Sequence, residues 1–483
     1  MSLSRKLVAV LTILALTIVP FMSVLAQDAM IESVCLVTDI GRINDGTFNQ
    51  YAYEGMSRAV EDFALDSTFI ETQAQTDYNN NIDTCLSEGY DAIVTVGFLI
   101  TDATYAAAQA NPDVFFLGVD QFFADPLPNL VGIQFREDQA GFLVGAMAGL
   151  MTESNVIAGV YGIDVPAVVK FRNGYENGAR YVNPDINVLG VYIDSFTAPD
   201  RGASAAEQFI GEGADVIFGA GGSTGSGAIL YGSSQGKWVI GVDQDEYYTT
   251  FGGGETAGAE YLISSAQKRV DNGVYDMIAA LVEGAGLPAS SLYILEIAND
   301  GIQFAPANDA AVPQEVTDQV FEILYGLRDG RITTGVDPVS GAPLGNIAEV
   351  ATGAGSFSTL LAAVDAAGLG ETLSTGGPFT VFAPTDEAFA AALESLGLTA
   401  EELLADTETL TNILTYHVVP NALAAGAVAN STSLTTVQGS PINVAVVDGG
   451  VVLNDTVNVV ATNVNAANGI IHVIDGVLLP PTE

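Results

Sequence analysis

Three aspartates each follow an apolar run that is typical of a β-strand. They are Asp39 after residues 34–38, Asp120 after residues 114–119, and Asp243 after residues 238–242. One such residue is as often a turn former or a helix N-cap as a ligand-binding group. In an open α/β sheet, however, ligands bind beyond the carboxyl ends of the strands. Three carboxylates at equivalent strand ends therefore favour a shared polar cleft.

A glycine-rich loop, residues 219–227 (GAGGSTGSG), follows another strand-like run and precedes a predicted helix. Asp243 lies about one strand-helix-strand step later, as an acidic residue does in dinucleotide-binding sites. The sixth position of the fingerprint is Thr224 where that pattern requires glycine. We interpret the loop, including Gly221, as a close approach of backbone to a ligand, with a dehydrogenase as the weaker alternative.

Catalytic and metal chemistry has little support in the residue types. The chain contains two histidines, His417 and His472, and both lie in its last third. The long preceding part therefore has no histidine for a nucleophile-base pair. No dense carboxylate loop has calcium-binding spacing. We expect a non-enzymatic protein without a cofactor or metal.

The elements that would carry the cleft alternate between strand-like and helical segments from residue 33 to about residue 325. Predicted strands cover residues 34–37, 92–96, 114–117, 156–160, 215–218 and 238–242, and amphipathic helices include residues 51–63, 140–151 and 203–211. This alternation predicts parallel α/β sheets wrapped by helices. The content is about twice that of one doubly wound lobe, so we expect two lobes.

The composition excludes several classes of partner. The chain has 483 residues, with 14 Lys and Arg against 58 Asp and Glu, which gives a formal net charge of -44. This charge repels nucleic acid and anionic lipid surfaces. Hydrophobic residues make up 49% of the chain, enough to bury sizeable cores.

The first residues indicate export. Arg5 and Lys6 precede an apolar run over residues 7–22, and small residues at positions 24–26 precede Gln27. This pattern predicts a signal peptide over residues 1–26, with an uncleaved membrane anchor as the alternative. The expected location is extracellular, at the cell surface or in the periplasm.

The two cysteines are Cys35 and Cys85, and export makes a disulfide between them chemically permissible. Neither directly follows the predicted cleavage site, so the usual lipid attachment of an anchored bacterial receptor is not indicated.

Turn-forming residues over 326–330 and 337–343 predict the end of one domain and a linker, with a boundary near residue 344. The remaining segment has a helical first part followed by alternating strands, with residues 448–450 as a hairpin turn. We expect an independent α+β unit there.

An ordered series of segments runs through the large module. They are residues 39–50 (DIGRINDGTFNQ), 53–55, 97–103 (GFLITDA), 135–141 (FREDQAG), 145–146, 171–174 (FRNG), 213–218, 240–243 (IGVD) and 265–268 (SAQK). With these segments, roughly residues 33–340 resemble the basic membrane protein family, which includes the purine nucleoside receptor A proteins.

This resemblance implies a substrate-binding protein of an ABC importer with a type I periplasmic-binding-protein fold, whose two doubly wound lobes close on a nucleoside by hinge motion. It implies that Phe48 and Phe196 stack on the base. Asn49 and Asp120 would bind the base edge. Asp243 would accept hydrogen bonds from the ribose hydroxyls.

Three further roles and their alternatives follow from the same resemblance. Lys268 would balance the charge of Asp243 and bind the ribose, and Asp39 would shape the cleft floor. For Phe48 the alternative is a hydrophobic staple at a helix start. For Lys268 it is a solvated helix position.

The C-terminal part resembles a fasciclin-like domain over about residues 344–481, on the segments 379–389 (FTVFAPTDEAF), 414–420 (LTYHVVP) and 468–480 (NGIIHVIDGVLLP). His417 and His472 lie inside these segments. We expect each ring to bond nearby backbone, a structural role.

The sequence therefore predicts residues 27–340 as a two-lobed solute-binding domain and residues 341–483 as a linker and fasciclin-like domain. The predicted function is binding of a nucleoside, with a purine favoured, and delivery of it to a separate ABC permease and ATPase. The small domain would attach to cell wall, matrix or another cell. Alternatives are another sugar-like solute, an adhesion protein, or an exported nucleosidase or dehydrogenase.

Overall fold

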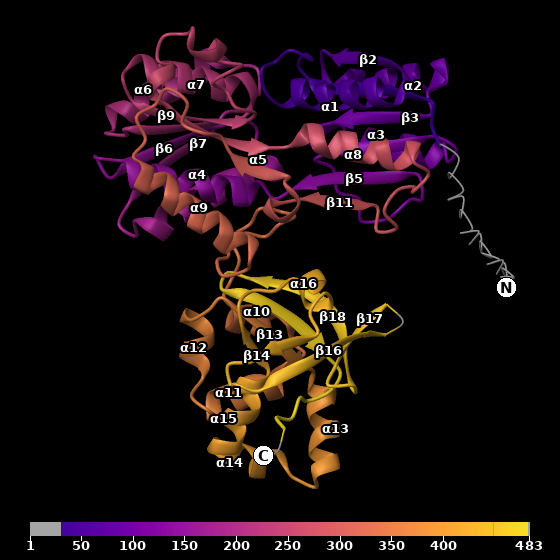
Figure 1. The fold of residues 1–483 in the computed structure, drawn as a ribbon, viewed down its shortest axis with the longest axis vertical. Coiled ribbons are helices and arrows are strands. Elements are labelled where there is room, and N and C mark those ends of the chain that lie inside the picture. The colour runs from indigo at the N-terminus through magenta and orange to yellow at the C-terminus, as the bar shows by residue number, and fades with distance from the viewer. Residues whose placement is uncertain (1–29, 448, 482–483) are drawn as a thin grey trace, which may run out of the picture.

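A computed structural model describes residues 30–447 and 449–481. The predicted signal peptide lies outside the described residues. Within them, the helices are all too short or too polar to cross a membrane. Two sheets, one parallel and one mainly parallel, form two lobes with their helices, and a third, mixed sheet belongs to a small module that lies beneath them in Figure 1. The predicted fold class is confirmed.

Lobe 1 contains a sheet of six parallel strands in the order β11-β5-β4-β3-β1-β2. Its strands are β1 (Ser33–Ile40), β2 (Asp66–Thr72), β3 (Ala92–Val96), β4 (Phe115–Val119), β5 (Leu130–Phe135) and β11 (Leu292–Leu295). Its helices are α1 (Phe48–Phe63), α2 (Tyr78–Glu88), α3 (Thr101–Ala110) and α8 (Val270–Val282). The central strands are fully buried, as expected for a sheet covered on both faces.

Lobe 2 repeats this arrangement with the order β12-β10-β9-β8-β6-β7, in which only β12 is antiparallel. The strands are β6 (Val156–Tyr161), β7 (Asn187–Tyr192), β8 (Val216–Ala220), β9 (Trp238–Asp243), β10 (Leu262–Lys268) and β12 (Ile302–Phe304). The helices are α4 (Glu137–Met151), α5 (Pro166–Val182), α6 (Pro199–Gly211), α7 (Gly222–Ser234) and α9 (Gln314–Arg328).

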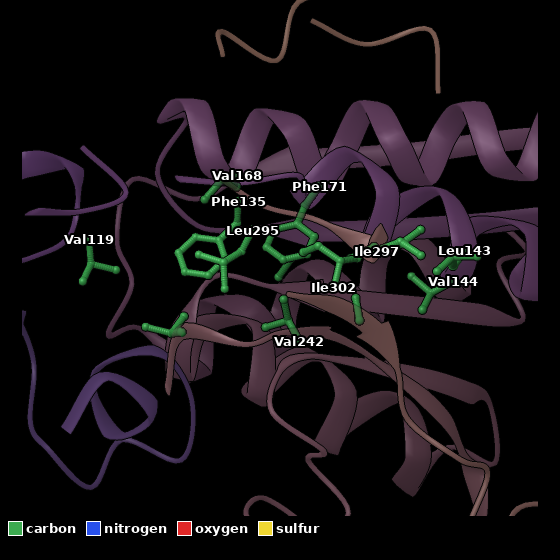
Figure 2. Close-up of a cluster of buried hydrophobic side chains, with 14 of the residues drawn as sticks. Val119, Phe135, Leu143, Val144, Val168, Phe171, Val242, Leu295, Ile297 and Ile302 are labelled. Carbon is green, nitrogen blue, oxygen red and sulfur yellow. The ribbon is translucent and has the colours of Figure 1, made fainter. Parts of the chain in front are cut away.

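The chain crosses between the lobes three times: from β5 into α4, from β10 into α8, and from β11 to β12. A continuous apolar cluster lies at these crossings and includes Phe135, Phe171, Val242, Leu295 and Ile302 (Figure 2). Residues from both lobes therefore share one core beneath the cleft.

Helices α4 and α5 pack closely because glycines on each meet the backbone of the other. A Cβ atom on Gly141 or Gly145 would overlap α5 backbone, and one on Gly174 or Gly178 would overlap α4 backbone. Three of these glycines lie in or beside the segments that carry the family resemblance. Their role in the structure is helix packing.

The small module begins with α10 (Ile347–Ala354) and ends after β19 (Gly469–Ile474). Between them lie α11 (Ser358–Ala366), α12 (Gly370–Thr375), β13 (Phe379–Pro384), α13 (Asp386–Leu396), α14 (Ala400–Ala405), α15 (Thr407–Tyr416), β14 (Val418–Pro420), α16 (Ala425–Ala429), β15 (Ser433–Thr435), β16 (Pro441–Val447), β17 (Gly450–Leu453) and β18 (Val457–Ala466). Antiparallel pairing of Val447 with Gly450 confirms the predicted hairpin, although residue 448 itself lies outside the described residues.

The predicted linker is a folded strap, residues 329–345, that lies on lobe 2. The side chains of Asn173 and Asn177 donate to the carbonyls of Gly341 and Thr334, at 2.7 and 2.9 Å. On its other side, Gly345 accepts from the backbone N–H of Ala467 at 2.8 Å. The turn-forming residues thus indicate an irregular segment, as the structure shows. This segment is hydrogen-bonded both to α5 of lobe 2 and to the small module.

Candidate ligand-binding cleft

A cavity between the lobes is lined by all eight residues that the sequence assigned to ligand binding. They are Asp39, Phe48, Asn49 and Asp120 from lobe 1, and Phe196, Gly221, Asp243 and Lys268 from lobe 2. Its volume is ≈ 90 Å³. These residues lie together because the carboxyl ends of both sheets face this space, and their contacts with a ligand stay a prediction.

Asp39 lies within β1, one residue before its end, and its carboxylate rests against the backbone of Gly97. It accepts hydrogen bonds from the Tyr78 hydroxyl and from the backbone N–H of Ile40. Burial raises the pKa of Asp39 to about 6, although these donors favour the charged form. The residue therefore forms a fixed acidic part of the cleft wall, in agreement with the predicted role.

Asn49, in the first turn of α1, is held inside lobe 1. Its Oδ1 accepts from the backbone N–H of Asp39 at 3.0 Å, and its Nδ2 donates to Asp45 at 3.0 Å. The side chain is therefore already bonded at both ends, and its role in this structure is to position Asp39 and Asp45. Asp45 also lines the cleft. Sequence reasoning missed it because an aspartate before a helix is an ordinary cap.

Asp120 follows β4 with a left-handed backbone, φ 61°, which turns its side chain into the cleft. Its Oδ2 lies 2.6 Å from the Nζ of Lys268, at the end of β10. Lys268 is 1% exposed, so the alternative of a solvated helix position is wrong. Within the described residues, Oδ1 of Asp120 is buried without a hydrogen-bond partner. This oxygen is available to a ligand.

Lys268 has a second carboxylate partner, Glu137, at 2.8 Å, and Glu137 also contacts Lys170 at 2.6 Å. Burial alone would raise the pKa of Glu137, but the two ammonium groups hold it below its usual value. Burial likewise opposes charge on Lys268, yet Asp120 and Glu137 raise its pKa. The direct ion-pair partners of Lys268 are Asp120 and Glu137. Lys268 also lowers the pKa of Asp243, which agrees with its predicted part in balancing that charge.

Asp243 ends β9 with φ 64° and is 6% exposed. Burial raises its pKa to about 8, because the lowering effect of Lys268 is smaller and Asp120 and Asp45 add negative charge. Behind it, buried Glu246 accepts from the backbone N–H of Val242 at 3.0 Å. The backbone that precedes Asp243 is therefore held in place, and burial favours the protonated form of the Asp243 carboxyl.

The two predicted stacking rings enter the cavity from different lobes. Phe48 is the first residue of α1, after the cap position Thr47, so the staple alternative does not apply. The Nζ of Lys268 lies 4.9 Å from the centroid of its ring. Phe196 lies in the loop between β7 and α6, and its ring rests against Gly162, where a Cβ atom would meet it at 2.5 Å.

Gly221 also lines the cavity, and its main contact is with another loop. A Cβ atom there would overlap the backbone of Gly162, and its φ of 149° is unfavourable for other residues. The glycine-rich loop therefore brings two lobe 2 loops together under Phe196. Its glycines permit this contact, and the approach of the loop to a ligand stays a prediction.

Cys35 of β1 and Cys85 of α2 form a disulfide in the structure, with Cα atoms 5.9 Å apart. Both residues are fully buried, away from the cleft lining. The bond fastens α2, which supplies Tyr78, to the strand that carries Asp39.

Both histidines bond backbone groups, as predicted. His417 Nδ1 lies 2.8 Å from the carbonyl of Ile413, and its Nε2 accepts from the N–H of Leu478 at 2.9 Å. His472 Nε2 lies 2.9 Å from the carbonyl of Leu423. Across residues 30–447 and 449–481, no cluster of three or more His, Cys, Asp or Glu side chains is arranged to hold a metal ion.

Comparison with known proteins decides the family. The family model described as "ABC transporter substrate-binding protein PnrA-like" matches residues 32–324, more than half of the chain. The chain belongs to this family. It also carries a fasciclin domain, whose family model matches residues 355–480. This PnrA-like protein is thus an ABC transporter substrate-binding protein with a fasciclin domain at its C-terminal side.

Curated relatives agree with this assignment. The ABC transporter nucleoside-binding protein BmpA of Lactococcus lactis is 30% identical over 311 residues, which cover 62% of this chain and 87% of the relative. Basic membrane protein A of Borreliella burgdorferi is 34% identical over 222 residues, which cover 45% of this chain and 65% of that protein.

Solved structures support the two-lobed fold. An ABC transporter solute-binding protein from Aeropyrum pernix is 24% identical, with a TM-score of 0.55 over 62% of this chain and 92% of the other. One from Conexibacter woesei is 20% identical, with a TM-score of 0.50 over 64% of this chain and 99% of the other. Because both identities are low, they bear on the fold alone.

Proposed function

We propose that this protein is the exported receptor of an ABC importer and that its cleft closes on a nucleoside, with a purine as the preferred base. The observation that carries the proposal is the pair of aromatic rings, Phe48 and Phe196, that line one cavity from opposite lobes. A planar base between two rings gains stacking with either face, and only closure of the lobes completes the stack.

The polar groups beside these rings support a sugar-bearing ligand. Asp243 offers two oxygens at a separation that matches vicinal ribose hydroxyls, and the free oxygen of Asp120 accepts from a base or sugar donor. The ammonium of Lys268 is fixed by Asp120 and Glu137, so it can donate to the ligand without reorganisation. The relative from Lactococcus lactis, named as nucleoside-binding, adds to this support.

Calorimetric titration of the protein with adenosine, guanosine, inosine, uridine and ribose tests the proposal. We expect saturable binding of one or more purine nucleosides, weaker binding of uridine, and little binding of ribose alone. Phe196→Ala should lower nucleoside affinity by roughly tenfold, since stacking on an aromatic side chain contributes about 1–3 kcal/mol per base.

Phe321→Ala is the matched control, because Phe321 lies on α9, is 41% exposed and does not line the cleft. It should bind nucleosides as the unchanged protein does. Failure of every nucleoside to bind would overturn the proposal. Binding of ribose with unchanged affinity in Phe196→Ala would replace the nucleoside by another sugar-like solute.

We further propose that the small module holds the receptor at the cell wall, matrix or cell surface, while a separate permease and ATPase carry out transport. The fasciclin domain and the predicted signal peptide support this role. A deletion should begin after Gly345, so that the strap keeps its contacts with α5. The shortened protein should appear free in the culture medium with unchanged nucleoside affinity. Equal retention of both forms on cells would contradict the tether.

A further inference from the structure

The small module contains a second cavity that the receptor function does not use. It is enclosed by α10, α11, α12 and α15 on the helical side and by β13, β14 and β19 on the sheet side. Its volume is ≈ 70 Å³, against ≈ 90 Å³ for the cleft. One water needs about 10–15 Å³ on such a measure, so the cavity is several waters in size.

The lining of this cavity is almost entirely hydrocarbon. Its residues are Ile347, Ala348, Ala351, Leu360, Leu361, Val364, Leu369, Thr372, Leu373, Phe379, Val381, Ala383, Leu414, Thr415, Val418, Val437 and Ile471. Only two carry a polar side chain, and the hydroxyl of Thr415 donates to the carbonyl of Thr411 at 2.7 Å. Water gains few partners in such a space, whereas an apolar group gains contacts on all sides.

One wall of the cavity is only partly buried. Helix α12 has six residues, none of them fully buried, although Thr372 and Leu373 line the cavity. The side chain of Asn468 donates to the carbonyl of Leu373 at 2.9 Å, so α12 moves aside only when this hydrogen bond breaks, but it exposes little buried apolar area. At the neighbouring edge, Val437 is 48% exposed and lines the mouth. An apolar chain could thus enter without opening the core.

Beyond Val437 the cavity continues into a shallow depression that we call the polar shelf. The shelf is formed by Thr407, Glu408, Thr411, Asn412, Thr415 and Gln438, and it shares Thr415 and Val437 with the cavity and its mouth. Hydroxyl and amide groups predominate there, with one carboxylate. Such a surface suits a head group rich in hydroxyls.

The charge of the module selects against anionic head groups. No Lys or Arg follows Arg331 in the sequence, whereas acidic residues continue throughout this part of the chain. A carboxylate or phosphate at the mouth would therefore meet Glu408 and no opposing cation from the module. A neutral head group avoids this repulsion.

We propose that the small module binds the aliphatic chain of a neutral lipid in this cavity, with the hydroxylated head group of the lipid on the polar shelf. The hydrocarbon lining recognises the chain, and the hydroxyl and amide groups of the shelf, beside the carboxylate of Glu408, favour a neutral head group. This site is independent of the cleft and goes beyond the proposed receptor function. It would give the small module a small-molecule ligand of the cell envelope.

Calorimetric titration of the full-length protein with monodecanoylglycerol, below the concentration at which it forms micelles, tests the proposal. We expect one saturable site. Decanoate at pH 8 should bind roughly tenfold or more weakly, because its chain is the same but its head is anionic. Glycerol, the head group alone, should not bind measurably.

Two variants locate the site. Ala348→Leu fills the cavity from α10, where Ala348 is only half-buried, and should weaken monodecanoylglycerol by roughly tenfold. Val437→Ser changes only the exposed mouth and should weaken it by about threefold. Ala390→Leu, at an exposed position of α13, is the matched control and should bind normally.

Nucleoside affinity should be the same in all three variants, which separates this site from the cleft. Absence of saturable monodecanoylglycerol binding to the unchanged protein would overturn the proposal. So would unchanged binding in both Ala348→Leu and Val437→Ser. Equal affinity for decanoate would overturn the choice of a neutral head group.

Discussion

The side-chain amide of Gln244 donates to the backbone carbonyl of Thr47 across the lobes, at 3.0 Å. Gln244 follows β9 of lobe 2 and is 7% exposed, and Thr47 immediately precedes α1 of lobe 1 and is fully buried. This bond lies beside Phe48 and Asp243, one from each lobe. It links the two walls of the cleft, and we expect it to favour the closed arrangement of the lobes.

Gln244→Ala should weaken nucleoside binding by about threefold to tenfold, because one such hydrogen bond contributes about 0.5–1.5 kcal/mol to the closed form. The loss should appear mainly as faster dissociation in stopped-flow measurements. The radius of gyration of the unliganded protein in solution scattering should increase. Gln208→Ala, on the exposed side of α6, is the control. An unchanged dissociation rate in Gln244→Ala would show that the bond does not hold the lobes.

Gly162→Ala should displace the ring of Phe196 into the cleft, since the new methyl group would meet that ring at 2.5 Å. Nucleoside affinity should fall at least as far as in Phe196→Ala, by roughly tenfold. Combining both changes should cost little more than either alone, because they act on the same contact. Calorimetry of the three variants checks this. Additive losses would contradict it.

Nucleoside affinity should increase with pH between about 6 and 8 and level off above it. The pKa of Asp243 is raised to about 8 in the empty cleft, so most molecules must lose its proton before the carboxylate accepts ribose hydroxyls. Titrations in buffers of different ionisation enthalpy should detect release of up to one proton at pH 7. In Asp243→Asn, proton release should be abolished. Proton uptake by the unchanged protein would contradict the assignment.

Glu137→Gln should lower the melting temperature of the receptor by roughly 10 °C, because it leaves two buried ammonium groups with one carboxylate fewer. Lys170→Met should lower it as well. The double variant, Glu137→Gln with Lys170→Met, should be more stable than Glu137→Gln alone, because no buried ammonium group remains at position 170 without its carboxylate partner. Thermal unfolding followed by circular dichroism distinguishes these outcomes. Additive destabilisation would show that Glu137 and Lys170 act separately.

The small module should lose stability as the pH falls from about 6.5 to about 4. Burial lowers the pKa of His417 to about 4 in the folded state, so protonation favours the unfolded chain in this range. The protection of α15 amides, which precede His417, against hydrogen exchange should decrease relative to the intrinsic rate at each pH. His417→Leu should be less stable at pH 7, because it loses two hydrogen bonds, but its protection should depend less on pH. Equal pH dependence in both proteins would assign the effect to another group.

The sequence could place the three aspartates of the cleft because they lie at or beside strand ends. Asp120 and Asp243 could be placed together from local patterns alone, since parallel strands bring their carboxyl ends to one edge. The role of Asn49 could not be read in this way. Its amide is used by Asp39 and Asp45, and such bonding depends on side-chain directions that no spacing in the sequence specifies.

The ion network behind the cleft was missed for a different reason. Glu137 opens α4 and resembles an ordinary acidic first-turn residue, which usually faces solvent. Its burial depends on Lys170 from α5 and Lys268 from β10, which are distant in sequence. The strap was likewise judged from its turn residues, whereas its bonds come from asparagines on α5.

Because the strap is hydrogen-bonded on both sides, it restricts rotation of the small module relative to the receptor lobes. A flexible linker would allow the lobes, and with them the cleft, to reorient freely about the point of attachment. Because residues 329–345 are bonded on both sides, a surface that holds the small module would also fix the distance of the cleft from that surface and its orientation. A permease partner would then encounter the ligand-binding cleft in one constant orientation.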